Sequence, residues 1–237
     1  MKKDLNPEQL QAVQWVQGPL LVLAGAGSGK TRVIEYRSIF LVEEMNVPPS
    51  RILLLTFTRK AAYEMIQRAA RHSPDCQRIQ GGTFHSFAYN MLRQYGSHLG
   101  LPRFTLLDRS DSEDVLELSI QELGFRKKKE RFPKKETVLQ IFQLALSRRK
   151  SIEDVLKESY PQFLNLEEEL EKLRQHFTQY KLEKSYVDYD DLLVYLHLLL
   201  EDESLGNKIR SHYSYIMVDE YQDTNYLQGR ITYLLGK

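Results

Sequence analysis

Three short runs of apolar residues occur along the chain, and amphipathic stretches fill most of the intervals between them. The runs lie at residues 20–23, 52–55 and 215–218, and a weaker strand signal lies at residues 79–84. A short continuous apolar run is typical of a strand that is buried on both faces. Helices are predicted between these strands at about residues 30–44, 59–70 and 86–95. Strands that alternate with helices predict an α/β fold, in which helices flank a parallel sheet.

The pattern changes between about residues 106 and 186, where helical periods replace strand signals. One apolar face recurs at spacings of four and three residues, in Leu166, Leu170, Leu173, Phe177 and Tyr180. That spacing is typical of an amphipathic helix, and we assign these residues to packing. The sequence therefore predicts a sheet domain made of residues 1–105 and 187–237, interrupted by an inserted, all-helical lobe at residues 106–186.

Composition narrows the class of protein without identifying a function. The chain has 237 residues, 42% of them hydrophobic, a net charge of +1 and one cysteine, Cys76. A single cysteine excludes an internal disulfide and fits a reducing compartment. The first residues do not resemble a signal peptide, and no apolar run approaches the roughly 20 residues that a membrane span needs. We expect a cytoplasmic protein without a membrane partner.

A glycine-rich segment between the first predicted strand and the helix after it has the pattern of a phosphate-binding loop. It consists of Ala24, Gly25, Ala26, Gly27, Ser28, Gly29, Lys30 and Thr31. Glycines let successive backbone N–H groups point inward at phosphate oxygens, and the helix N-terminus adds partial positive charge. Lys30 is suited to the β- and γ-phosphates, and the Thr31 hydroxyl to Mg²⁺. The strict pattern begins with glycine, where this chain has Ala24.

Two adjacent acids supply the second half of the predicted site. Asp219 and Glu220 directly follow the apolar run at residues 215–218. Ligands of open α/β sheets bind at the carboxyl ends of the strands. Asp219 is therefore a candidate ligand of Mg²⁺, and Glu220 a candidate base that orients and deprotonates the attacking water.

Six ordered motifs make the chain resemble the UvrD/Rep/PcrA family of DNA helicases. They are Leu5-Asn-Pro-Glu-Gln9, the loop at residues 24–31 followed by Arg32, Thr56-Phe-Thr-Arg-Lys-Ala-Ala62, Gly82-Thr-Phe-His-Ser86, Asp188-Tyr-Asp-Asp-Leu-Leu193 and Asp219-Glu-Tyr-Gln-Asp-Thr-Asn225. The loop of that family also starts with alanine, whereas Arg59 stands where its next motif has asparagine. The motifs cover almost the whole chain, and the two most specific are those at residues 83–87 and 219–225.

The resemblance implies a RecA-like, ATP-dependent motor that moves 3′ to 5′ on single-stranded DNA and acts at junctions with duplex DNA. It makes ATP and Mg²⁺ the expected cofactors. It places Gln9 and Arg32 on the adenine side, and it gives Gln222 a role in coupling the γ-phosphate to the DNA side. A second RecA-like domain of the family is missing from these residues. We therefore expect the chain alone to hydrolyse ATP poorly and not to unwind DNA.

The resemblance also implies a DNA-facing set of side chains, namely Phe57, Thr58, Arg59, Thr83 and His85. Hydroxyls, an imidazole and a cation can bind phosphates without reading the base sequence. Phe57 is equally suited to stacking on a base or to the core, and for Phe84 we favour the core. The alternative role of His85 is that of a structural residue. Arg59 adds positive charge to the surface and removes any contact that is specific to asparagine.

Other interpretations remain open for one segment and for the whole chain. Residues 126–135 carry seven cations and one acid; they are a DNA contact or a solvated loop, and we favour the loop. The chain is alternatively the ATPase motor of a nuclease- or recombination-associated complex. A third alternative is a non-catalytic DNA-binding fragment, which the intact Lys30, Thr31, Asp219 and Glu220 disfavour.

Overall fold

The computed structural model describes residues 4–25, 27–127 and 132–237. Ala26 of the glycine-rich loop and residues 128–131 of the basic cluster lie outside the described residues. The chain divides into two compact units, each described here by itself. Unit 1 comprises Met1–Phe87, His197–Thr224 and Gly229–Lys237, and unit 2 comprises Ala88–Leu196 and Asn225–Gln228.

Unit 1 is built on a three-stranded parallel sheet. The strand β1 (Ile52–Thr56) lies between β2 (Gln80–Thr83) and β5 (Tyr215–Val218). Thr56 pairs with Thr83 on one side, and Leu55 pairs with Val218 on the other. Because all three strands run in parallel and end in register, the segments that follow them emerge at the same edge of the sheet.

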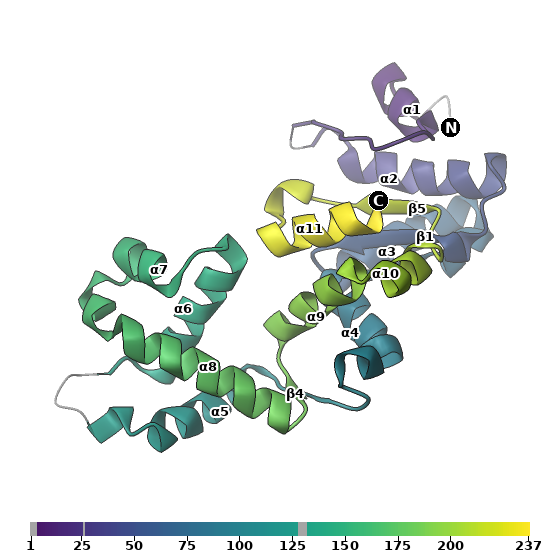
Figure 1. Ribbon diagram of the computed structural model, residues 1–237. Coiled ribbons are helices and arrows are strands. Elements are labelled where there is room, and N and C mark those ends of the chain that lie inside the picture. Colours follow the sequence, from purple (N-terminus) through teal and green to yellow (C-terminus); the bar gives the residue numbers. More distant parts are fainter. Residues whose placement is uncertain (1–3, 26, 128–131) are drawn as a thin grey trace. The chain divides into compact units, whose positions relative to one another are not determined.

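The central strand forms because its side chains are apolar and can be covered on both faces. All five residues of β1 are buried. The helices α2 (Lys30–Ile39) and α3 (Arg59–His72) lie beside this sheet (Figure 1). The buried core that they share with the sheet contains Ile39, Leu41, Ile52, Leu54, Met65, Ala69, Cys76, Ile79 and Met217. A Cβ atom at Gly81 would lie 2.4 Å from the Ile66 side chain, so glycine permits the close approach of α3 to β2.

The remaining elements of the chain outside the helical core of unit 2 are helices and short turns. The α-helices are α1 (Pro7–Gln14), α4 (Phe84–Tyr95), α9 (Tyr189–Glu201), α10 (Glu203–Arg210) and α11 (Tyr226–Leu235). The short helical turns are η1 (Phe40–Glu44), η2 (Pro49–Arg51), η3 (Pro74–Arg78), η4 (Gly96–Leu99) and η7 (Tyr221–Asp223). Among the described residues, no helix is long and apolar enough to cross a membrane.

The strand predicted at residues 20–23 is wrong. These residues adopt no regular secondary structure, and the side chains of Leu21 and Leu23 are 65% and 85% exposed. An apolar run is buried as a strand only if neighbouring strands satisfy its backbone groups. Within the described part of the chain, no strand pairs with this run, and β5 is an outer strand of the sheet. The other three predicted strands are confirmed as β1, β2 and β5.

Within the described part of unit 2, four of the helices surround one apolar core. They are α5 (Arg109–Glu122), α6 (Lys135–Arg148), α7 (Ile152–Ser159) and α8 (Glu167–Glu183), with turns η5 (Phe125–Lys127) and η6 (Pro161–Leu166). The helical face predicted from the sequence is confirmed, because Leu166, Leu170, Leu173 and Phe177 are all buried there. The unit is not purely helical, since the short strands β3 (Thr105–Leu106) and β4 (Tyr186–Val187) pair in parallel.

A buried ion cluster joins the end of α8 to the beginning of α9 within unit 2. The Nζ of Lys181, which is 5% exposed, donates to Oδ2 of Asp188 and, at 2.7 Å, to Oδ2 of Asp191. The two aspartates also cap the helix reciprocally, because each accepts a backbone N–H of the other. Burial raises the pKa of Asp191 to about 6, and the negative charge of Asp188 acts in the same direction. These contacts hold β4 between two helices.

Candidate functional site

The glycine-rich loop takes a curled conformation that requires glycine at two positions. Gly27 and Gly29 have φ angles of 75° and 88°, in the left-handed region. The Ser28 hydroxyl donates to the Gly25 carbonyl at 2.7 Å and closes the turn. Alternating residues of this kind turn backbone N–H groups toward a common centre, which is the geometry of an anion-binding nest.

The loop leads directly into α2, whose first residue is Lys30. Its N-cap, Gly29, makes no side-chain hydrogen bond to the helix, so the first N–H groups keep their capacity to bind an anion. The Nζ of Lys30 lies over the loop and donates to the carbonyls of Ala24 at 3.2 Å and Gly25 at 3.4 Å. The cation, the helix N-terminus and the curled loop thus converge on one position.

Gln9 connects α1 to this loop. Its Nε2 donates to the Ser28 carbonyl at 2.9 Å, while its Oε1 accepts the backbone N–H of Asn6 at 3.0 Å. A Cβ atom on Gly29 would lie only 2.9 Å from that Nε2. On the same side, the Arg32 guanidinium donates to the Asp4 carbonyl at 3.4 Å. The structure therefore brings Gln9 and the loop together and holds Arg32 beside them.

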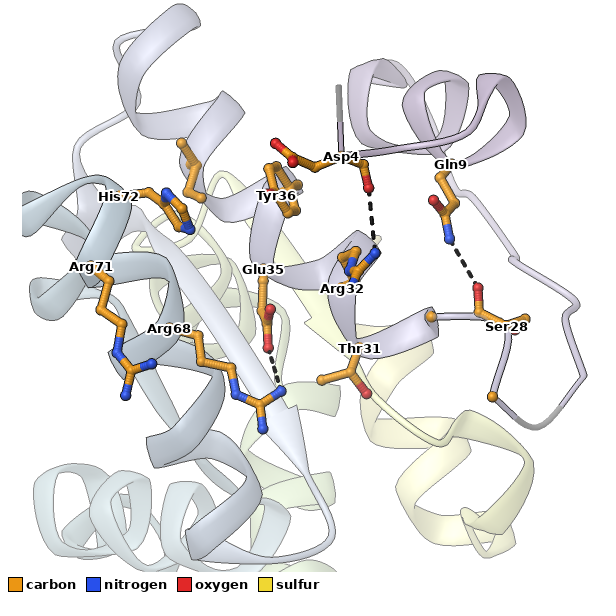
Figure 2. A pocket seen from close by; sticks show the side chains of 13 residues that line it. Asp4, Gln9, Ser28, Thr31, Arg32, Glu35, Tyr36, Arg68, Arg71 and His72 are labelled. Carbon is orange, nitrogen blue, oxygen red and sulfur yellow. Dashed lines mark hydrogen bonds and ion pairs between the residues drawn. The ribbon is translucent and has the colours of Figure 1, made fainter. Parts of the chain in front are cut away.

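A cavity of about 770 Å³ opens beside the loop, and Gln9, Thr31 and Arg32 line it. Figure 2 shows these side chains on one side, with α3 side chains on the other. Sequence reasoning missed this second wall. It contains Arg68, Arg71 and His72 of α3, together with Glu35 and Tyr36 of α2. The available signal was the helical spacing of Arg32 with Tyr36, and of Arg68 with His72, on single faces of α2 and α3.

The second wall carries both aromatic and charged groups. The rings of Tyr36 and His72 lie 6.0 Å apart at 35°. Arg68 forms an ion pair with Glu35 at 3.1 Å across the groove between the helices (Figure 2). Burial raises the pKa of the Tyr36 phenol, and the negative charge of Asp4 and a hydrogen bond that the phenol donates to it act in the same direction. These groups extend the site away from the phosphate loop.

The acidic pair lies at the carboxyl end of β5, as predicted. The backbone N–H of Asp219 continues the sheet by donating to the Leu55 carbonyl at 2.9 Å. Burial and the negative charge of Glu220 raise the pKa of Asp219, whereas the positive charge of Lys30 lowers it. This electrostatic interaction connects the acid at the strand end to the cation of the loop.

Glu220 has an unusual backbone conformation for a side chain that is not glycine. Its φ angle is 50°, in the left-handed region, which costs about 1 kcal/mol or more. The Gln222 Nε2 donates to Glu220 Oε2 at 2.5 Å and to Asp223 Oδ2 at 3.4 Å. Gln222 therefore orients the Glu220 carboxylate, and strain at this position is typical of functional sites.

The oxygens of Thr31 and Asp219 suit a small hard cation. Mg²⁺ usually takes one or two protein oxygens and completes its shell with water and phosphate. A Cβ atom at Gly25 or Gly27 would meet no atom within 4 Å, so there is open space beside these two positions of the loop. The residues present therefore fit a magnesium-bound triphosphate.

The segments after β1 and β2 emerge together at the sheet edge. Phe57 directly follows β1 and is 44% exposed, so it lies at the surface, and Arg59 is exposed as well. Phe84 is 2% exposed, which confirms its assignment to the core. His85 is partly buried, and this burial lowers its pKa.

The hydroxyls of Thr58 and Thr83 are engaged in capping helices. Thr58 Oγ1 accepts the N–H of Ala61 at 3.1 Å at the start of α3. Thr83 Oγ1 accepts the N–H of Ser86 at 3.1 Å, and the Ser86 hydroxyl accepts the N–H of Thr83 in return. The sequence signal for these caps is the spacing of three residues. Both threonines therefore shape the turns that present the surface.

Known proteins resemble the chain over almost its full length. Residues 5–237 match the family described as UvrD/REP helicase N-terminal domain. The ATP-dependent DNA helicase PcrA of Leuconostoc citreum is 36% identical, over 100% of this chain and 31% of that protein. The PcrA protein of Staphylococcus epidermidis is 34% identical, over 99% of this chain and 32% of that protein.

A protein of Mycoplasma capricolum, described as "Probable DNA helicase II homolog", is 35% identical over 94% of this chain and 31% of its own length. The chain thus spans about a third of the length of these relatives. The match extends over the loop, the acidic pair and both strand-end segments described above. On these grounds, the chain belongs to the UvrD/Rep family of DNA helicases, whose N-terminal domain it represents.

Proposed function

We propose that the chain is the ATP-binding part of a 3′-to-5′ DNA helicase or translocase that acts on single-stranded DNA. The observation that carries the proposal is the position of Asp219 and Glu220 at the end of β5, where the positive charge of Lys30 of the loop acts to lower the pKa of Asp219. A loop cation and a strand-end acid pair are the two halves of a P-loop ATPase site. The relatives from Leuconostoc and Staphylococcus are named as ATP-dependent DNA helicases, which supports this reaction.

In this proposal, the residues of the loop bind and orient ATP. Backbone N–H groups of residues 24–31 and the Lys30 ammonium bind the phosphates, while Gln9 and Arg32 bind on the adenine side. Thr31 and Asp219 would hold Mg²⁺, which when bound neutralises charge that develops on the β- and γ-phosphate oxygens. Glu220 orients a water molecule and removes its proton, and Gln222 fixes the direction of that carboxylate.

DNA is proposed to bind at the edge of the sheet where β1 and β2 end. Phe57 offers a ring face to a base, and Arg59 offers a cation to the phosphates. Thr58, Thr83 and His85 complete this surface. Asp219 follows β5 of the same parallel sheet, so one sheet would support both the nucleotide site and the DNA site.

The family also supports a proposal about the larger assembly. We propose that residues 106–186 act as an inserted accessory lobe and that residues 1–105 and 187–237 form the motor domain. A second RecA-like domain of the full-length protein would complete the cleft for ATP and engage junctions of single-stranded and duplex DNA. Without that domain, residues 1–237 would hydrolyse ATP slowly.

Strand separation by the full-length protein tests the function. With ATP and Mg²⁺, we expect it to separate a duplex that has a 3′ single-stranded tail and to leave a blunt or 5′-tailed duplex largely paired. Unwinding from the 5′ tail alone would contradict the proposed polarity. Hydrolysis of ATP without any separation would favour a motor of another kind, and DNA binding without hydrolysis would favour a non-catalytic fragment.

A further inference from the structure

Neither core packing nor helix formation explains why an aromatic residue, Tyr63, stands at an exposed position of α3. Its side chain is 65% exposed, the largest exposed fraction of any aromatic residue in the described part of the chain. The helix is packed against the sheet through Ala62, Met65 and Ala69, which leaves Tyr63 outside the core. Tyrosine also has a lower helix propensity than alanine, arginine or glutamine. An aromatic ring at this position therefore stabilises neither the core nor the helix.

The neighbours of Tyr63 on the helix are cations. Arg59 and Lys60 precede it by four and three residues, so both lie on the same side of the helix, one turn closer to its start. Both are exposed, and the Lys60 side chain is 85% accessible, with Glu64 at 3.8 Å as an ion-pair partner. The surface around the ring is thus basic on balance, and it complements a polyanion.

The direction of the side chain points to the end of β1. Helical side chains tilt toward the helix N-terminus, so a ring at position 63 covers the turn that precedes it. That turn begins immediately after Phe57, which is 44% exposed. Phe57, Arg59, Lys60 and Tyr63 therefore form a continuous surface, here called the α3 entry surface, in which two aromatic residues flank two cations.

We propose that Tyr63 stacks on a base of single-stranded DNA and extends the strand's path from Phe57 onto α3. This proposal rests on the proposed function. Proteins that bind single strands without reading the sequence combine cations, which bind the backbone, with exposed rings, on which bases stack. The α3 entry surface has both cations and exposed rings, and the ring of Tyr63 is exposed to solvent beside the cations.

Binding of oligothymidylate to the full-length protein, followed by fluorescence anisotropy at several salt concentrations, tests this role. Tyr63→Ala should weaken binding by about 5- to 100-fold, the range found when one stacking residue is removed. The slope of affinity against salt should stay unchanged, because no phosphate contact is lost. Tyr63→Phe and Tyr63→Trp should bind as the wild type does, since both keep a ring.

A strand of the same length without bases separates stacking from other effects. On that strand, the wild type and Tyr63→Ala should bind equally. Tyr233→Ala is the matched control, because Tyr233 is 60% exposed on α11 and should not affect DNA binding. Circular dichroism checks that each variant is folded.

The possible failures are distinguishable. Normal binding by Tyr63→Ala would overturn the role of Tyr63 and leave the proposed function intact. Equal losses in Tyr63→Phe and Tyr63→Ala would overturn stacking and assign the contact to the hydroxyl. A wild-type protein that does not bind single-stranded DNA would overturn the proposed function itself.

Discussion

The side-chain amide of Gln9 donates a hydrogen bond of 2.9 Å to the backbone carbonyl of Ser28, 19 positions further along the chain. This contact joins α1 to the loop at the point where Gly29 begins α2. The loop conformation therefore depends on a residue outside the glycine-rich segment. A substitution at position 9 should weaken binding of the phosphates of ATP as well as contacts on the adenine side.

We expect Gln9→Ala to raise the KM for ATP roughly tenfold, with a smaller effect on kcat. The loss of one hydrogen bond to a backbone carbonyl and of one to a helix N-terminus costs about 1–2 kcal/mol in total. Steady-state ATPase measurements with saturating DNA check this. Gln11→Ala on the same helix is the control, and a Gln9→Ala enzyme with wild-type KM would exclude the coupling.

Glu220→Gln tests chemistry separately from binding. The substitution keeps size and polarity and removes the base, so ATP should bind nearly as in the wild type while turnover falls at least ~100-fold. Calorimetry measures the binding, and a single-turnover assay measures the chemical step. If the variant turned over at the ordinary rate, Glu220 would not be the group that activates water.

Asp191 makes the stability of the folded state depend on pH, with a sign that is unusual for a carboxyl group. Because its pKa is raised to about 6 from 3.8, the folded state holds the proton more tightly than the unfolded state. The contribution of this carboxyl to stability is therefore fully present below about pH 4 and is lost as the pH rises through about 6. The loss is about 3 kcal/mol, since the shift is about two pKa units and one unit corresponds to about 1.4 kcal/mol.

Hydrogen exchange of the α8 backbone amides at pH 5 and pH 7, corrected for intrinsic rates, measures this dependence. Asp191→Asn should flatten it. Asp114→Asn, at an acid that is 68% accessible and pairs with Lys135, should leave it unchanged. A wild-type protein whose α8 is equally protected at both pH values would contradict the assignment.

Much of the fold could be predicted from local pattern. The run at residues 52–55 became the fully buried β1, because apolar side chains on both faces leave few alternatives to a central strand. The run at residues 20–23 has the same composition and is exposed, since burial depends on a pairing strand that local sequence does not specify. Pattern alone cannot distinguish these two cases.

The candidate site was predictable where its residues are consecutive. The loop was predicted from Gly27, Gly29 and Lys30, because its geometry needs those residue types in that order. The wall formed by Tyr36 and Arg68 was missed, since it arises from the packing of α2 on α3. The capping role of Thr83 was not predicted, because its reciprocal hydrogen bonds with Ser86 depend on the backbone conformation of the turn between β2 and α4.

The central claim is that the loop of residues 24–31 binds ATP for a DNA-dependent motor. The most direct measurement is ATP hydrolysis by the full-length protein with and without single-stranded DNA, for the wild type, Lys30→Ala and the control Lys172→Ala, at a lysine that is 68% accessible on α8. We predict that DNA stimulates the wild type and the control alike. Lys30→Ala should lose at least ~100-fold in rate and bind Mg-ATP much more weakly, because a cation that faces the phosphates is removed. Unchanged affinity and DNA-stimulated hydrolysis in Lys30→Ala would contradict the account.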